Sequence, residues 1–152
     1  MPIAIIAVGK KHEAWVEAGI ERYQKRLKKP FNTEWVLLPH SSLEDDRARQ
    51  EESGRILSRL QSYDIIVLLD ERGKLFDSPS VSRLLVEHLN HSAKIAFIIG
   101  GAYGVTDELR EKATYLWSLS PLVFPHQLVR LILTEQLYRA QEITGGGSYH
   151  HE

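Results

Sequence analysis

The strongest constraint on the fold is a regular alternation of short apolar runs with helix-like segments. The apolar runs occupy residues 2–8, 33–38, 63–69, 94–99 and 115–119, and each is followed by a segment with helical spacing or a helix-start signal. Short runs that are apolar throughout are typical of parallel strands buried on both faces. The alternation therefore predicts an α/β fold, with a mostly parallel five-stranded sheet and helices on both faces.

The size and composition of the chain predict one domain, residues 1–152. No linker divides it, and no apolar run approaches the roughly 20 residues that span a bilayer. The absence of cysteine excludes disulfides, a thiolate zinc site and a cysteine nucleophile, and it fits a cytoplasmic protein. The acidic residues between positions 45 and 52 lack a neighbouring histidine or a calcium-type glycine turn, so we expect no metal.

Charge gives no general signal for nucleic-acid binding, because 19 basic and 20 acidic residues leave a formal net charge of −1. A protein of this charge that acts on RNA needs a local basic patch. Two readings of the basic residues around the expected first helix, residues 13–29, stay open: a solvated helix end favoured by the dipole, or contacts with RNA phosphates. The residues concerned are Lys10, Lys11, Arg22, Lys25, Arg26 and Lys29.

Two loops at expected strand ends are candidates for ligand binding, since ligands of open α/β sheets bind beyond the carboxyl ends of the strands. Gly100, Gly101 and Gly104 follow the fourth apolar run. They allow close backbone approach or form only a tight turn, and their spacing excludes both the dinucleotide and the P-loop patterns. A nicotinamide-dependent oxidoreductase is therefore disfavoured. The second loop brackets apolar residues between prolines and predicts a lined pocket: Ser120, Pro121, Leu122, Val123, Phe124 and Pro125.

The last expected helix, residues 126–143, carries polar residues at four-residue spacing. His126 and Arg130 form one such pair, and Glu135 and Arg139 form another. The alternative readings are a helix cap for His126 and a surface ion pair for the second pair. Beyond the helix, spacing alone predicts a disordered tail, although tyrosine and histidine at positions 149 and 150 are able to donate or accept protons.

Several motifs spread over the whole chain resemble one family. They are IAIIAVGK, LLDERGK, FIIGGAYG, WSLS, FPHQLVRLILTEQLYRA and the terminal YH. Together they are similar to the RlmH-type methyltransferases of the SPOUT class. The resemblance implies a C-terminal trefoil knot, a homodimer and S-adenosylmethionine as methyl donor without a metal. It also implies methylation of the ring N3 of a pseudouridine in large-subunit (23S) rRNA on the assembled ribosome.

The resemblance also implies roles for particular residues. Cofactor contacts fall on Leu69, Gly100, Gly101 and the loop at 120–125. The catalytic candidates are His126, Arg130, Tyr149 and His150, the last two reaching the site of the partner protomer. His151 stands where the family usually has arginine or lysine, so a phosphate contact there is in doubt. The alternative from another functional class is a non-catalytic ribosome- or RNA-binding module.

Overall fold

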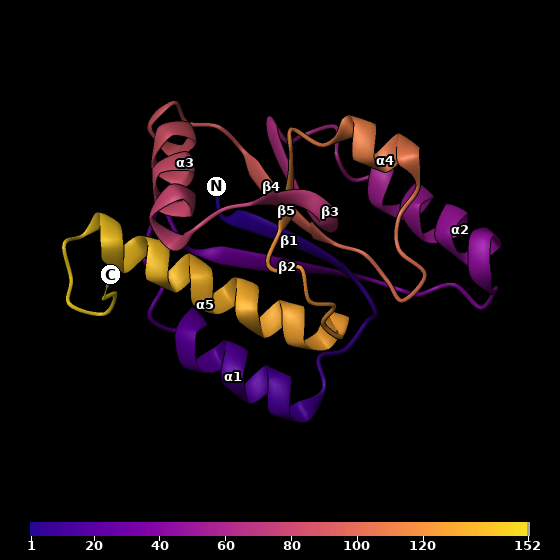
Figure 1. Cartoon of the computed structure of the whole chain (residues 1–152), viewed down its shortest axis with the longest axis horizontal. Coiled ribbons are helices and arrows are strands. Elements are labelled where there is room, and N and C mark those ends of the chain that lie inside the picture. The colour runs from indigo at the N-terminus through magenta and orange to yellow at the C-terminus, as the bar shows by residue number, and fades with distance from the viewer. Residues whose placement is uncertain (152) are drawn as a thin grey trace.

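The computed structural model describes residues 1–151, which form alternating strands and helices (Figure 1). The strands are β1 Ile3–Val8, β2 Thr33–Leu38, β3 Ile65–Leu75, β4 Ile95–Ile99 and β5 Tyr115–Ser118. The helices are α1 Ala14–Gln24, α2 Asp45–Leu57, α3 Ser78–Asn90, α4 Asp107–Lys112 and α5 His126–Thr144. The alternation expected from the apolar runs is confirmed.

All five strands belong to one sheet with the order β2-β1-β4-β3-β5, and every neighbouring pair is parallel. The predicted α/β class is therefore confirmed. Because all strands run the same way, the loops that follow them lie at the same edge of the sheet. The polar and glycine-containing segments after β1, β3, β4 and β5 are thereby brought together.

The core has two sides, and successive residues of the central strands alternate between them. In β1, Ile3 and Ile5 face one cluster and Ala4 and Ile6 face the other. Helices α1, α3 and α5 pack together over the first side, whereas α2 and α4 cover the second (Figure 1). The central strands are thus buried on both faces, which is why they are apolar throughout.

Strand β3 is longer than predicted, because the segment expected to turn out of the sheet after Leu69 returns to it. Leu69 and Lys74 both pair with Trp117 of β5, so the residues between them bulge out of the ladder. A side chain at Gly73 would overlap the backbone of Leu116, so the returning segment passes very close to β5. The bulge places Asp70 and Arg72 at the carboxyl edge of the sheet.

Helix α1 ends at Gln24 and not near residue 29, so the basic residues from Lys25 onward lie in turns. The side chain of Gln141 fixes these turns: its amide donates to the Arg26 carbonyl at 3.0 Å, and its oxygen accepts from the Lys28 amide at 2.7 Å. A partner from the far end of the chain thus supplies hydrogen bonds that a longer helix would have supplied itself.

Helix α5 begins just after the edge strand β5 and returns to pack against α1 and α3 (Figure 1). The trefoil knot implied by the resemblance stays a prediction. Within residues 1–151, no helix has both the length and the apolar character needed to cross a membrane.

Candidate active site

A cavity of about 920 Å³ opens at the carboxyl edge of the sheet, between the segments that follow β3, β4 and β5. Pro121 is the one predicted cofactor residue that does not line it. The other eight do: Leu69, Gly100, Gly101, Ser120, Leu122, Val123, Phe124 and Pro125. The two loops singled out from the sequence are therefore two walls of one cavity, joined by the end of β3.

The glycine loop after β4 forms a tight turn and also lines the cavity, whereas close backbone approach to a ligand stays a prediction. Gly101 and Gly104 form an isolated antiparallel bridge, and the Gly104 amide donates to the Gly101 carbonyl at 3.1 Å. Gly104 has a φ of +80°, which favours glycine. A Cβ on Gly101 would lie 2.5 Å from a carboxylate oxygen of the buried Glu52, so the backbone has no room for a side chain there.

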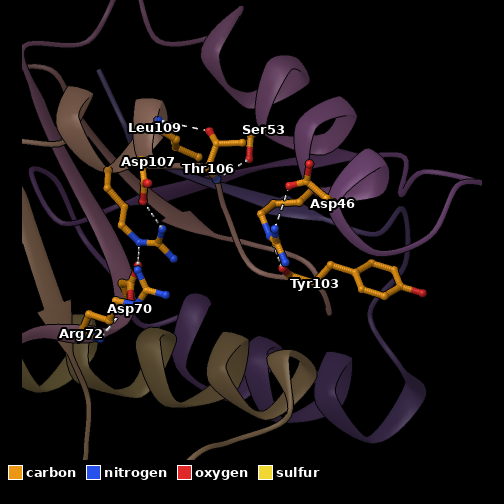
Figure 2. Close-up of polar contacts among 10 residues, drawn as sticks. Asp46, Ser53, Asp70, Arg72, Tyr103, Thr106, Asp107 and Leu109 are labelled. Carbon is orange, nitrogen blue, oxygen red and sulfur yellow. Dashed lines mark hydrogen bonds and ion pairs between the residues drawn. The ribbon is translucent and has the colours of Figure 1, made fainter.

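Helix α2 holds this loop from outside (Figure 2). The Arg49 guanidinium donates to the Tyr103 carbonyl at 2.8 Å, and the Ser53 hydroxyl accepts from the Thr106 amide at 3.0 Å. The Thr106 hydroxyl then caps α4 by accepting from the Leu109 amide at 3.3 Å. The loop is thus fixed at both ends independently of any ligand.

The segment after Leu69 is held by an ion pair that the sequence did not reveal. Asp70, whose side chain is only 6% exposed, accepts from Arg110 at 2.6 Å and from the Arg72 amide at 2.9 Å (Figure 2). Arg110 also pairs with Asp107 at 2.9 Å, and these carboxylates raise the pKa of its guanidinium against the effect of burial. The sequence held no signal for Arg110 beyond its place on a short helix after the glycine loop.

The loop after β5 presents its apolar side chains to the open cavity. Ser120 orders it, because its carbonyl accepts from the Ser118 hydroxyl at 2.9 Å and its own hydroxyl accepts from the Leu122 amide at 3.0 Å. Leu122 and Val123 are 68% and 79% exposed. An ordered loop with uncovered apolar side chains is suited to bind a flat, partly apolar ligand.

His126 is the first residue of α5 and lines the cavity. Its buried Nδ1 has no hydrogen-bond partner within residues 1–151. Burial, and after it the charge of Arg130, lower the pKa of the imidazole below its usual value. His126 is therefore neutral near pH 7 and able to accept a proton.

Arg130 lies behind the cavity and does not line it. Its side chain is fully buried, and it donates to the carbonyls of Val8 at 2.9 Å, Gly9 at 3.1 Å and Lys11 at 3.1 Å. These contacts tie the beginning of α5 to the loop after β1. The predicted pair of His126 and Arg130 is thus split between the cavity wall and a structural contact beneath it.

Tyr149 and His150 fold against α5, so the prediction of a disordered tail is wrong for these two residues. The Tyr149 hydroxyl donates to Glu135 at 3.1 Å, and Arg139 lies 3.0 Å from His150 Nδ1 and 4.8 Å above the Tyr149 ring. Glu135 and Arg139 pair at 2.9 Å with side chains 17% and 24% exposed, which is more buried than the surface pair considered for them.

Tyr149, His150 and His151 do not line the 920 Å³ cavity of their own chain. His150 and His151 line a second cavity of about 730 Å³ near the start of α3, which shares Trp117, Leu119 and Phe124 with the first. The Tyr149 hydroxyl has a raised pKa, mainly through burial and then through Tyr23 and Glu135. Tyr149 is therefore a hydrogen-bond donor and not a base near neutral pH.

The basic residues considered for RNA binding are all exposed and fall into two groups. Lys10 and Lys11 lie beside the cavity, because the Lys11 carbonyl accepts from Gln127 and from Arg130 of α5. The second group, Arg22, Lys25, Arg26 and Lys29, gathers near the other end of α5, where Gln141 holds the turns. The helical rise from His126 to Gln141 separates the groups by about 20 Å.

Comparison with known proteins assigns the family. Residues 1–150 match the family model described as "Predicted SPOUT methyltransferase". The chain is 39% identical over 158 aligned positions to "Ribosomal RNA large subunit methyltransferase H" of Desulfitobacterium hafniense (strain DSM 10664 / DCB-2), covering 99% of each protein. It is 37% identical to the protein of that name from Thioalkalivibrio sulfidiphilus (strain HL-EbGR7), covering 100% of both.

Solved structures support the same fold at low sequence identity. A putative methylase family protein from Neisseria gonorrhoeae superposes with a TM-score of 0.58 at 14% identity, over 99% of this chain and 86% of that one. TrmJ from Z. mobilis ZM4 superposes with a TM-score of 0.55 at 8% identity, over 93% and 70%. Fold, cavity and full-length sequence similarity agree, and the chain belongs to the SPOUT methyltransferase family.

Proposed function

We propose that this protein transfers a methyl group from S-adenosylmethionine to the ring N3 of a pseudouridine in large-subunit (23S) rRNA, on the assembled ribosome. Two full-length relatives carry the name of a large-subunit rRNA methyltransferase. The observation that supports the proposal most is the convergence of eight of the nine expected cofactor positions on one cavity. These positions come from three separate segments, after β3, β4 and β5, and they line one cavity.

The cofactor is proposed to lie against the ends of β3, β4 and β5. Gly100 and Gly101 let the backbone approach the ligand closely, and Leu122, Val123 and Phe124 offer apolar surface to its adenine ring. Backbone groups of the loop at 120–125 are proposed to read the edge of the heterocycle, apart from the Ser120 carbonyl and the Leu122 amide, which are hydrogen-bonded within the protein. Pro121 is proposed to shape this loop and not to touch the ligand.

The chemistry is a displacement at carbon. S-adenosylmethionine bound in this cavity would supply a sulfonium leaving group. The N3, once deprotonated, would form the new C–N bond, the S–CH₃ bonding electrons would return to sulfur, and no metal would be needed. The chain must align the reactants and remove the N3 proton. His126 is the proposed proton acceptor, because it lines the cavity and is neutral. Arg130 is proposed to act through the position of this helix end.

We propose a homodimer in which Tyr149 and His150 of one protomer complete the site of the other. The support is that these residues are ordered by Glu135 and Arg139, yet they do not line the cavity of their own chain. Tyr149 would donate a hydrogen bond to the charge that develops on the base. His151 is exposed and is proposed to have no fixed phosphate contact.

The remaining parts of the proposal concern topology and place of action. We propose that the chain acts as a single domain with a C-terminal trefoil knot, in the cytoplasm, where ribosomes are found. Lys10, Lys11 and the basic turns after α1 are the proposed rRNA contacts. They compensate locally for a chain with no basic excess.

Label transfer tests the proposal. Tritiated S-adenosylmethionine is incubated with 70S ribosomes, free 50S subunits and naked rRNA from cells that lack this enzyme. Incorporation into 70S ribosomes is expected, with little into naked rRNA. Label in none of the three would contradict the proposal and leave the alternative, a non-catalytic ribosome- or RNA-binding module.

A further inference from the structure

The mouth of the cavity exposes an aromatic side chain that the proposed cofactor site does not use. Six large apolar side chains are exposed within residues 1–151, and three of them, Tyr103, Leu122 and Val123, line this one cavity. Leu122 and Val123 belong to the loop expected to hold the cofactor. Tyr103 comes from the opposite wall, at the tip of the glycine turn, and is 39% exposed.

Tyr103 is exposed on a rigid support. Its carbonyl is held by Arg49, the turn on which it sits is closed by the hydrogen bond between Gly104 and Gly101, and the next segment is held by Ser53. Figure 2 shows the phenol ring projecting away from these polar contacts. Because the turn beneath it is ordered, this partly exposed ring loses little conformational freedom when a flat group stacks on it.

The charges around the mouth favour a neutral group inside and phosphates outside. Asp46 is paired with Arg49, and both Asp70 and Asp107 are paired with Arg110, so most charged side chains of the lining already have partners. The exposed Lys10 and Lys11 lie next to the start of α5, beside the cavity and not within it. This distribution matches a nucleotide whose base enters while its phosphates stay at the basic rim.

We propose that Tyr103 is a stacking platform for an unpaired base of the substrate rRNA, either the target base or its neighbour. This inference rests on the proposed function, because it requires an RNA substrate. The N3 atom lies on the pairing edge of the base, so methylation requires the base to leave its partner. An aromatic face at the cavity mouth offsets the stacking lost in that step and holds the base toward the cofactor end.

Three variants of one position test the proposal. Tyr103→Phe keeps the ring and is the matched control, Tyr103→Leu keeps apolar surface without the ring, and Tyr103→Ala removes both. The measurements are KM for 70S ribosomes and the calorimetric Kd for S-adenosylmethionine with free protein. We expect Tyr103→Phe to match the wild type, and Tyr103→Leu and Tyr103→Ala to raise KM by about tenfold with unchanged cofactor Kd.

Two results would overturn the stacking role. One is a wild-type KM in Tyr103→Leu, and the other is an equal rise of cofactor Kd in that variant, which would place the ring in the cofactor site. Co-sedimentation of each variant with 70S ribosomes separates this inference from the proposed function. If the wild type binds ribosomes without methylating them, the proposed function fails, and weaker binding of Tyr103→Leu than of Tyr103→Phe still supports stacking.

Discussion

The guanidinium of Arg130 donates a hydrogen bond to the backbone carbonyl of Lys11 over 3.1 Å. This contact, together with those to Val8 and Gly9, fixes the loop that follows β1 against the first turns of α5. One buried side chain therefore links a cavity residue, His126, to the lysines expected to contact RNA. We propose that Arg130 acts by positioning these two groups relative to each other.

Replacing Arg130 is predicted to lower the stability of the folded protein. Arg130→Leu leaves the buried carbonyl of Val8 and the partly buried carbonyl of Gly9 without this donor, and an unsatisfied buried group costs about 1–3 kcal/mol. The free energy of unfolding, measured by urea denaturation, should fall by about 2 kcal/mol or more. Arg22→Leu, at an exposed position of α1, is the control and should change it by less than about 0.5 kcal/mol. Equal effects of the two substitutions would contradict the buried role.

Removal of residues 149–152 is predicted to abolish methylation while leaving cofactor binding intact. The cavity in which the cofactor is proposed to lie is lined without these residues. Activity is measured by label transfer to 70S ribosomes and cofactor binding by calorimetry. Turnover retained by the truncated protein would show that the tail takes no part in the reaction.

Mixed dimers decide whether the tail acts on the partner. A protein lacking residues 149–152 is mixed with His126→Asn and allowed to exchange subunits. If the tail acts across the dimer, the heterodimer contains one site with an intact His126 and an intact tail, and activity returns. If the tail acts within its own chain, no site has both, and the mixture stays inactive.

The pH dependence of kcat/KM should show the titration of a histidine with a lowered pKa. Burial and Arg130 disfavour the imidazolium form of His126, so it stays a proton acceptor to a pH below the usual histidine value of about 6.5. The acid limb of kcat/KM is therefore predicted to lie below that value. His126→Asn should lose this limb and fall in rate by about 10²–10⁴. An acid limb at or above the usual value would contradict the assignment.

The same lowered pKa affects folding in a defined direction. In the window between the folded-state pKa of His126 and about 6.5, the unfolded chain binds more protons, so stability rises with pH. The stabilising contribution is complete above about 6.5 and is lost as the pH falls through the folded-state value. Urea denaturation of the wild type and of His126→Asn across this window measures the difference, and parallel curves would contradict it.

If the two basic groups contact rRNA phosphates, replacing them should change how ribosome binding depends on salt concentration. Lys10→Ala/Lys11→Ala, and separately Lys25→Ala/Arg26→Ala/Lys29→Ala, are predicted to weaken ribosome binding. Each lost phosphate contact should reduce the slope of log K against log salt by roughly 0.7–0.9. Lys112→Ala, at an exposed position at the end of α4, is the control. If the slope stays unchanged when a group is replaced, that group makes no phosphate contact and is only a solvated part of the surface.

The sheet could be predicted from the sequence because its central strands are buried on both faces, which leaves continuous apolar runs such as residues 3–8. Helix caps are equally local: Asp77 at the start of α3 and Thr106 at the start of α4 each accept a hydrogen bond from the amide three residues further on. These features depend on local sequence alone. The cavity walls followed from them, because strand ends in a parallel sheet meet at one edge.

The features that the sequence did not reveal depend on partners far along the chain. The return of β3 to the sheet requires Trp117, and the early end of α1 requires Gln141. Arg130 is buried because its guanidinium donates to the backbone carbonyls at the end of β1. The spacing of apolar residues in the sequence does not indicate which backbone carbonyls need such a donor. The order of Tyr149 likewise requires a carboxylate 14 residues earlier that pairing with Arg139 holds in place.

The most direct test of the proposed reaction identifies the methylated atom. Ribosomes from cells that lack this enzyme are incubated with the protein and S-adenosylmethionine. The 23S rRNA is then digested to nucleosides, which are separated and identified by mass spectrometry. The proposed function predicts one new monomethylated pseudouridine, with the methyl group on the N3 of the base. Methylation of a ribose oxygen, of another base, or of no nucleoside at all would contradict it.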